Sequence, residues 1–280
     1  MTRPTESHWN PTLFEQLVEE PYDTSMGTAK VKTNATFGFL KAMGNRQGPH
    51  PLASEWVGTS LARWFGLRVA DFAILPLEQI DCYQLPRGAK TLPGPAFVSR
   101  YVFGRTWGKS VDELKRLENQ SDITRLVIFD NWTRNCDRHP TDVNTRKPNY
   151  ANVYLGDTEN PEKYRLYAID HTHCFDCGRD FTAKLSDINK IKDDGVYGLF
   201  PEFQPFISDG ELTWCKAMLR TVEIKEIRQI VDSIPAEWDV SSEARLALVE
   251  LIVQRAGYLA TKIENGWGSK WWQTPRESKS

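Results

Sequence analysis

The clearest candidates for chemistry are three polar residues on a loop, Asp137, Arg138 and His139. They follow a stretch of helical spacing over 122–135 and precede Pro140, which cannot continue a helix. A carboxylate, a guanidinium and an imidazole held together on a loop could act in acid–base chemistry. In isolation, such a short group more often forms a surface salt bridge near a helix end.

A second pair of candidates lies on the hairpin that follows. Two strand-like runs, 152–155 and 164–170, are joined by a polar turn. If their pairing is centred on Pro161, Asn152 lies opposite Asp170 with the two Cβ atoms about 5 Å apart. Mg²⁺ takes one or two protein oxygens together with water and phosphate oxygens, so this pair suits it. The alternative is a structural hydrogen bond between the two side chains.

The elements before residue 104 predict a small antiparallel sheet with one helix. Alternating polar and apolar residues indicate strands over 13–20, 29–33, 36–42, 70–77 and 96–103. Helical spacing predicts a helix over 52–65, which Gly66 can end. The hydroxyl-rich loop over 22–28 is either a plain hairpin loop or a cover for phosphate.

The rest of the chain is mainly helical in pattern. Helices are expected over 111–117, 122–135, 211–221, 223–233 and 242–264. The sequence therefore predicts an α+β protein of two lobes, 1–103 and 104–280, and the cleft between them is the default ligand site.

Composition excludes several classes of function. The 35 basic and 37 acidic residues leave a net charge of -2, so no general field would collect nucleic acid or anionic lipid. Apolar runs are far shorter than the roughly 20 residues of a membrane span, and the glycine patterns of P-loop and dinucleotide-binding proteins do not occur. Five cysteines, an odd number, predict reduced thiols and a cytoplasmic location.

Three motifs resemble, in order and spacing, the catalytic loop and metal-binding segment of HipA-like kinases: Asp137-Arg138-His139-Pro140, Asn152-Val153-Tyr154-Leu155 and Ala168-Ile169-Asp170-His171. These kinases are distantly similar to phosphoinositide kinases. The resemblance covers residues 14–175 and implies a two-lobed protein-kinase-like fold, with a small antiparallel-sheet N-lobe and a mainly helical C-lobe. The chain resembles a short member of the family that holds only the kinase domain.

The resemblance assigns ATP-binding roles to residues of the first lobe. Lys41 would contact the α- and β-phosphates, and Glu55 would orient Lys41. The backbone near Tyr101 and Val102 would hold adenine. The alternative for Lys41 is a solvated strand end, and for Glu55 a solvated helix face.

The resemblance assigns the reaction itself to residues of the second lobe. Asp137 would accept or align the acceptor hydroxyl proton, with His139 beside the transferring phosphate. Asn152 and Asp170 would hold Mg²⁺. The family's usual metal-binding asparagine falls at Asp142 here, so Asp142 and Asn144 stay as alternatives to Asn152 within a segment that carries an insertion.

The leading hypothesis is an ATP-dependent kinase that acts on a Ser or Thr of a protein and could be toxin-like. A lipid or small-molecule kinase is the alternative with the same chemistry. A nucleotide-binding pseudokinase that regulates a protein partner, with the Trp-rich tail as a docking segment, is the alternative of another class. The resemblance also suggests Ser25 as a phosphorylation site. A zinc module built on His171, His173, Cys174 and Cys177 is a further alternative.

Overall fold

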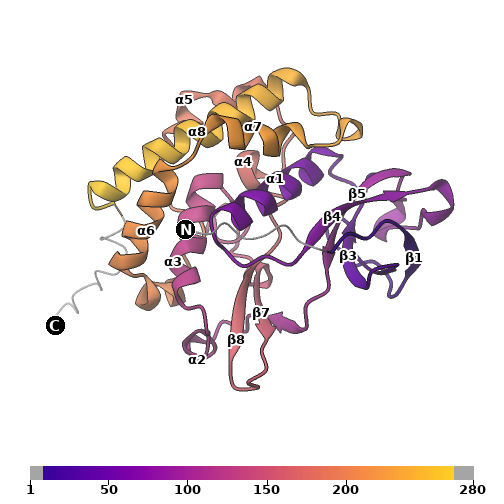
Figure 1. The fold of residues 1–280 in the computed structure, drawn as a ribbon, viewed down its shortest axis with the longest axis horizontal. Coiled ribbons are helices and arrows are strands. Elements are labelled where there is room, and N and C mark those ends of the chain that lie inside the picture. Colours follow the sequence, from indigo (N-terminus) through magenta and orange to yellow (C-terminus); the bar gives the residue numbers. More distant parts are fainter. Residues whose placement is uncertain (1–8, 268–280) are drawn as a thin grey trace.

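The computed structural model describes residues 9–267. Trp271 and Trp272, which belong to the predicted docking tail, lie outside the described residues. The described chain forms an antiparallel sheet on one side and a helical region on the other, with a second small sheet below them (Figure 1).

The N-terminal sheet has five antiparallel strands in the order β1-β2-β3-β5-β4. The strands are β1 (Phe14–Leu17), β2 (Ala29–Thr33), β3 (Phe37–Lys41), β4 (Phe72–Leu77) and β5 (Gly94–Arg100). Alternate residues such as Ala29, Val31, Leu75 and Val98 form a small core of their own. This sheet confirms the expected N-lobe.

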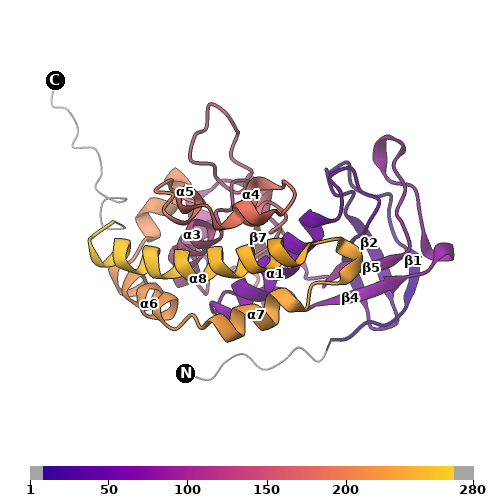
Figure 2. The ribbon, with the colours of Figure 1, turned by 90° about the horizontal axis from the view of Figure 1, so that it is seen from above.

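Helix α1 (His50–Trp64) connects β3 to β4 and is buried on nearly every side. Pro51 stands in its first turn, where a missing N–H costs no hydrogen bond, and Gly66 with φ 80° follows its end. Leu52, Val57 and Leu61 belong to the large core that the later helices also share. The helix therefore lies in the N-terminal part of the sequence but packs with the C-terminal part, as Figure 2 shows from above.

The C-terminal part is mainly helical. It contains α2 (Val111–Lys115), α3 (Ser121–Thr133), α4 (Cys174–Cys177), α5 (Ile188–Ile191), α6 (Asp209–Arg220), α7 (Ile224–Asp232) and α8 (Ser242–Glu264). Helix α8 packs on α6, α7 and α3, and Trp132 of α3 donates its indole N–H to the carbonyl oxygen of Ile252. Within residues 9–267, the helices lack the combination of length and hydropathy that crossing a bilayer would need.

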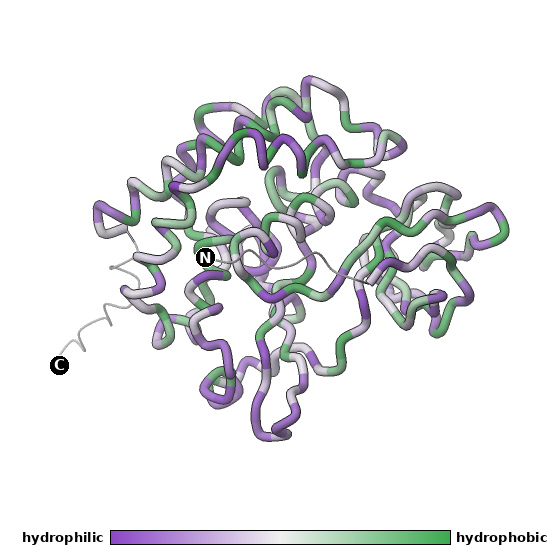
Figure 3. Tube along the Cα trace, in the orientation of Figure 1, coloured by the Kyte–Doolittle hydropathy of each residue, from purple (hydrophilic) through white to green (hydrophobic). Residues whose placement is uncertain are grey.

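A three-stranded sheet joins the two parts. It consists of β6 (Gly104–Thr106), β7 (Val153–Asp157) and β8 (Tyr164–Ala168) in that order. Strand β6 has only three residues and no alternation long enough to be recognised in the sequence. Figure 3 shows that the tip of the β7–β8 hairpin, at the bottom of the view, is hydrophilic.

The register of this hairpin differs from the prediction. Val153 pairs with Ala168, one residue away from the register expected for pairing centred on Pro161. Asn152 ends a 3₁₀ turn (Tyr150–Asn152) before β7 begins, and Asp170 lies beyond the end of β8. The two residues are thus not cross-strand partners, because the conformation of the turn sets the register and a one-residue shift moves every pair.

Candidate active site

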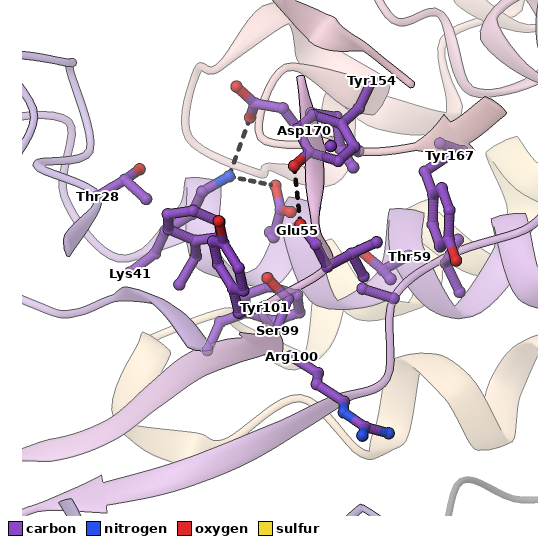
Figure 4. A pocket seen from close by; sticks show the side chains of 18 of the residues that line it. Thr28, Lys41, Glu55, Thr59, Ser99, Arg100, Tyr101, Tyr154, Tyr167 and Asp170 are labelled. Carbon is purple, nitrogen blue, oxygen red and sulfur yellow. Dashed lines mark hydrogen bonds and ion pairs between the residues drawn. The ribbon is translucent and has the colours of Figure 1, made fainter. Parts of the chain in front are cut away.

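A cavity of about 590 Å³ lies between the N-terminal sheet and the β7–β8 hairpin. Lys30, Lys41 and Ser99 line it from the large sheet, and Tyr154 and Tyr167 line it from the small one. The loop over 22–28 also contributes to the wall. Figure 4 shows Lys41 reaching into this cavity toward Asp170 and Glu55.

Lys41 forms a buried triad with two carboxylates. Its Nζ lies 3.0 Å from Glu55 Oε2 and 3.0 Å from Asp170 Oδ1. Lys41 is 8% exposed and Glu55 4%, so neither is the solvated residue of the alternative interpretation. Burial alone would lower the pKa of Lys41, but the two carboxylates raise it, so the amine is protonated at neutral pH.

The segment after β8 holds the carboxylates of the triad in place. Glu55 Oε2 accepts a hydrogen bond of 2.8 Å from the backbone N–H of His171, and Thr172 Oγ1 donates to Asp170 Oδ1 at 2.8 Å. Asp170 adopts a φ of 55°, a conformation that non-glycine residues rarely adopt outside special sites. Burial opposes ionisation of Asp170, but Lys41 and Thr172 hold its pKa well below the usual range.

Asp137 sits inside a ring of donors. Its Oδ2 accepts from Asn152 Nδ2 at 2.7 Å and from Asn149 Nδ2 at 3.0 Å. Its Oδ1 pairs with Arg146 Nη2 at 3.1 Å. His173 Nδ1 lies 3.9 Å from Oδ2 and also contacts the Thr172 hydroxyl that donates to Asp170. Asp137, Asn152 and Asp170 therefore belong to one connected group of polar side chains.

Arg138 links the segments that carry this group of polar side chains. It is fully buried and pairs with the equally buried Asp130 of α3 at 2.8 Å. Its guanidinium also donates to the carbonyl oxygen of Asn152 and, at 3.2 Å, to that of Ile169. One side chain thus joins the loop that carries Asp137 to both ends of the hairpin. Burial raises the pKa of Asp130 to about 6, although Arg138 opposes the shift.

The two alternatives to Asn152 lie elsewhere. Asp142 and Asn144 are exposed and hydrogen bond to each other, with Asn144 N 2.9 Å from Asp142 Oδ1. Asn152 is 4% exposed and shares the hydrogen-bond network of Asp137. The structure therefore brings Asn152, and not the other two, to the site.

His139 packs away from the charged cluster. Its Nδ1 lies 3.0 Å from the carbonyl oxygen of Pro140, and its ring meets that of Phe200 at 5.2 Å. Burial lowers its pKa, so the ring is neutral at pH 7. The contact with phosphate expected for His139 stays a prediction. Tyr101 and Val102, by contrast, do line the cavity.

The cysteines differ from the expectation of reduced thiols. Cys136 and Cys177 form a disulfide, whereas Cys82, Cys174 and Cys215 are free. Pairing was missed because 41 positions separate the two residues and only the packing of α4 beside the loop brings them together. The zinc alternative is also wrong, since no metal-binding group of three His, Cys, Asp or Glu side chains occurs in residues 9–267.

The sequence did not assign Asp130, Arg146 or Asn149 to the site, and it suggested His173 only as a zinc ligand. A signal existed for Asp130, an acidic residue within the apolar stretch of α3 and eight positions before Arg138. Arg146 and Asn149 lie in a loop without periodicity, so nothing local indicates that they face Asp137.

The family to which the chain belongs identifies it as a kinase, and its fold agrees. A model of the HipA-like kinase family matches residues 33–274, and the chain belongs to this family. The structure is similar to that of the proinflammatory kinase CtkA of Helicobacter pylori, with a TM-score of 0.59 and 13% identity over 91% of this chain and 97% of that chain. That likeness shows the two-lobed kinase-like fold. The search of curated proteins found no match.

Proposed function

We propose that this kinase transfers the γ-phosphoryl group of ATP to a hydroxyl group, and that the acceptor is a Ser or Thr of a protein. The observation that carries the proposal is the buried Lys41 amine held between Glu55 and Asp170 at the wall of a 590 Å³ cavity. Phosphoryl transfer needs a fixed cation at the phosphates and a carboxylate at the metal, and this triad offers both.

The nucleotide end of the cavity supports adenine binding by the backbone. The backbone N–H of Tyr101 donates a hydrogen bond to the carbonyl oxygen of Phe37, and the carbonyl oxygen of Val102 accepts one from the Tyr154 hydroxyl. Within residues 9–267, the Tyr101 carbonyl oxygen and the Val102 N–H have no hydrogen-bond partner. These two groups would hold the adenine edge. The Tyr22–Thr28 loop would cover the phosphates, with Ser25, which is exposed, as a site of autophosphorylation.

Asn152 and Asp170 would hold Mg²⁺. The amide nitrogen of Asn152 donates a hydrogen bond to Asp137. Oδ1 of Asp170 accepts hydrogen bonds from Lys41 and Thr172. One oxygen of each side chain is therefore left for a hard cation, which also takes water and phosphate oxygens. The bound ion would neutralise the developing charge on the phosphates.

Asp137 would align the acceptor hydroxyl. Asn149 and Asn152 fix its Oδ2 and hence the orientation of the carboxylate. The partners that we propose are a protein substrate and a regulatory protein, with no role for nucleic acid. A cytoplasmic location and toxin-like action stay predictions. A lipid or small-molecule kinase is the alternative within the same chemistry.

The test is transfer of label from γ-labelled ATP with Mg²⁺, with and without cell lysate. We expect labelled protein with the native chain and none with Asp170→Asn. Asp180→Asn is the matched control, because Asp180 is 74% exposed and lies outside the site. Label found in lipid or in small molecules would favour the alternative kinase.

A second variant separates a kinase from a pseudokinase. Asp137→Asn should bind ATP normally while turnover falls by about 10²–10⁴, the usual contribution of a positioned acid or base. ATP binding by the native chain without any turnover would favour the pseudokinase and overturn the proposal.

A further inference from the structure

The Cys136–Cys177 disulfide lies next to the residue proposed to align the acceptor. Cys136 directly precedes Asp137, and the loop that the disulfide closes contains Asp137, Asn152 and Asp170. We propose that this cysteine pair is a modification site, a reversible thiol–disulfide switch that slows phosphoryl transfer when oxidised. The proposal rests on the function proposed above and concerns the regulation of the same site.

Arg146 connects the sulfur atoms to Asp137. Its Nη1 lies 2.8 Å from Cys136 Sγ and 3.6 Å from Cys177 Sγ, while its Nη2 lies 3.1 Å from Asp137 Oδ1. Two asparagine amides already occupy Asp137 Oδ2. Both oxygens of the carboxylate are therefore engaged in the oxidised protein, and an acceptor hydroxyl must displace Arg146 to reach Oδ1.

Reduction converts the disulfide sulfur beside Arg146 into a thiolate. A thiolate of a dithiol reductant attacks Sγ of the partly exposed Cys177, the S–S bond breaks, and the electron pair leaves on Sγ of the buried Cys136. The second thiol of the reductant then releases Cys177 as a thiol and closes the reductant's own disulfide. Glutathione disulfide drives the reverse reaction. Reduction transfers two electrons from the dithiol to the cysteine pair, and oxidation transfers two electrons from the pair to glutathione disulfide.

The released Cys136 thiolate is a charged acceptor beside the Arg146 guanidinium, and guanidinium groups favour the thiolate form. A hydrogen bond to a charged sulfur is stronger than one to a disulfide sulfur. Arg146 already contacts both groups, through Nη1 and Nη2, so a Cys136 thiolate competes with the Asp137 carboxylate for one positive charge. This competition weakens the contact between Nη2 and Asp137 Oδ1, and the acceptor displaces Arg146 from that oxygen more easily.

The backbone around Cys177 supports a segment that can rearrange. Phe175 and Cys177 adopt φ values of 68° and 60°, so α4 contains conformations that non-glycine residues rarely adopt. The covalent link to Cys136 holds this short segment against the loop. The other buried cysteines, Cys174 and Cys215, are free, and burial raises the pKa of each thiol. They are poor competitors for oxidation.

The main experiment compares initial rates of label transfer by the full chain in two redox states. Cys82→Ser serves as the background, because Cys82 is the one partly exposed cysteine outside the pair. The protein is treated with dithiothreitol or with glutathione disulfide, and mass spectrometry of the cross-linked peptide measures the state of the pair. We expect a rate about tenfold higher after reduction, the size of one charge-assisted hydrogen bond.

Two variants test the route. Cys177→Ser should be as fast as the reduced protein and insensitive to either reagent. Arg146→Gln should remove the difference between the two states, whereas Arg179→Gln, an exposed arginine close to Cys177 in sequence, should keep it. Equal rates in the two states, or a lower rate after reduction, would overturn the switch while leaving the kinase activity established.

A readout that needs no activity separates this proposal from the proposed function. If Arg146 stabilises the thiolate, Arg146→Gln should shift the equilibrium with glutathione toward the disulfide by about tenfold, the equivalent of one pKa unit. An unchanged equilibrium would contradict the proposal. Label transfer absent in both states, together with the expected shift, would instead refute the proposed kinase activity and, with it, regulation of phosphotransfer.

Discussion

Arg138 offers the sharpest test of how the site is built, and we consider Arg138→Met. The change removes a fully buried guanidinium and leaves Asp130, which is also fully buried, without its ion-pair partner. It further removes donors from the carbonyl oxygens of Asn152 and Ile169. Breaking a buried pair in this way costs about 3–5 kcal/mol of unfolding free energy.

The assay is urea unfolding of three variants. Arg165→Met is the matched control, because Arg165 pairs with Glu118 at the surface and such pairs contribute only about 0–1 kcal/mol. The double variant Asp130→Asn/Arg138→Met removes both charges, so it should be more stable than Arg138→Met alone. If Arg138→Met costs no more than Arg165→Met, or if the double variant is the least stable, the buried charge is not the reason for the effect.

Three further predictions concern packing, pH and the disulfide. A Cβ on Gly58 would lie 2.5 Å from the Cβ of His171, so Gly58→Ala should lower the unfolding free energy, measured in urea, by about 1–3 kcal/mol. A Cβ on Gly257 in α8 would meet open space, so Gly257→Ala should raise it by about 0.5–1 kcal/mol. Equal effects of the two variants would contradict the close approach at Gly58. Burial raises the pKa of Asp130 from 3.8 to about 6, so its contribution to stability is complete below pH 3.8 and is lost as the pH rises through 6. Asp130→Asn should therefore flatten the dependence of unfolding free energy on pH in this window, and an unaltered dependence would exclude Asp130 as its source. The disulfide links positions 41 apart, so its reduction should lower the unfolding free energy by about 4 kcal/mol in the chain-entropy model; an unchanged urea midpoint with dithiothreitol would contradict this value.

Several elements could be predicted from the sequence with their bounds. The alternation over β2 (Ala29–Thr33) and the helical spacing over α8 (Ser242–Glu264) gave the limits that the structure has. Both patterns are local, because the side chains of one strand or helix report which of its faces is buried. The approach of Lys41, Glu55 and Asp170 was also anticipated, through the order of the family motifs.

The neighbours of Asp137 could not be predicted in the same way. Asn149 and Arg146 lie in a loop whose course depends on Arg138 and on the hairpin it holds. The one-residue error in the register of β7 and β8 has a similar origin, since the turn conformation and not the strand pattern sets it.

By itself, the sequence determined the longer strands and helices, though not short elements such as β6, and which chemical groups the protein has for binding phosphate and metal. Only the tertiary structure decided that Cys136 meets Cys177, that Arg146 covers Asp137, and that Arg138 is buried beside Asp130. The physical reason is that periodicity records burial along a single element. Contacts between polar side chains of distant loops depend instead on how whole elements pack.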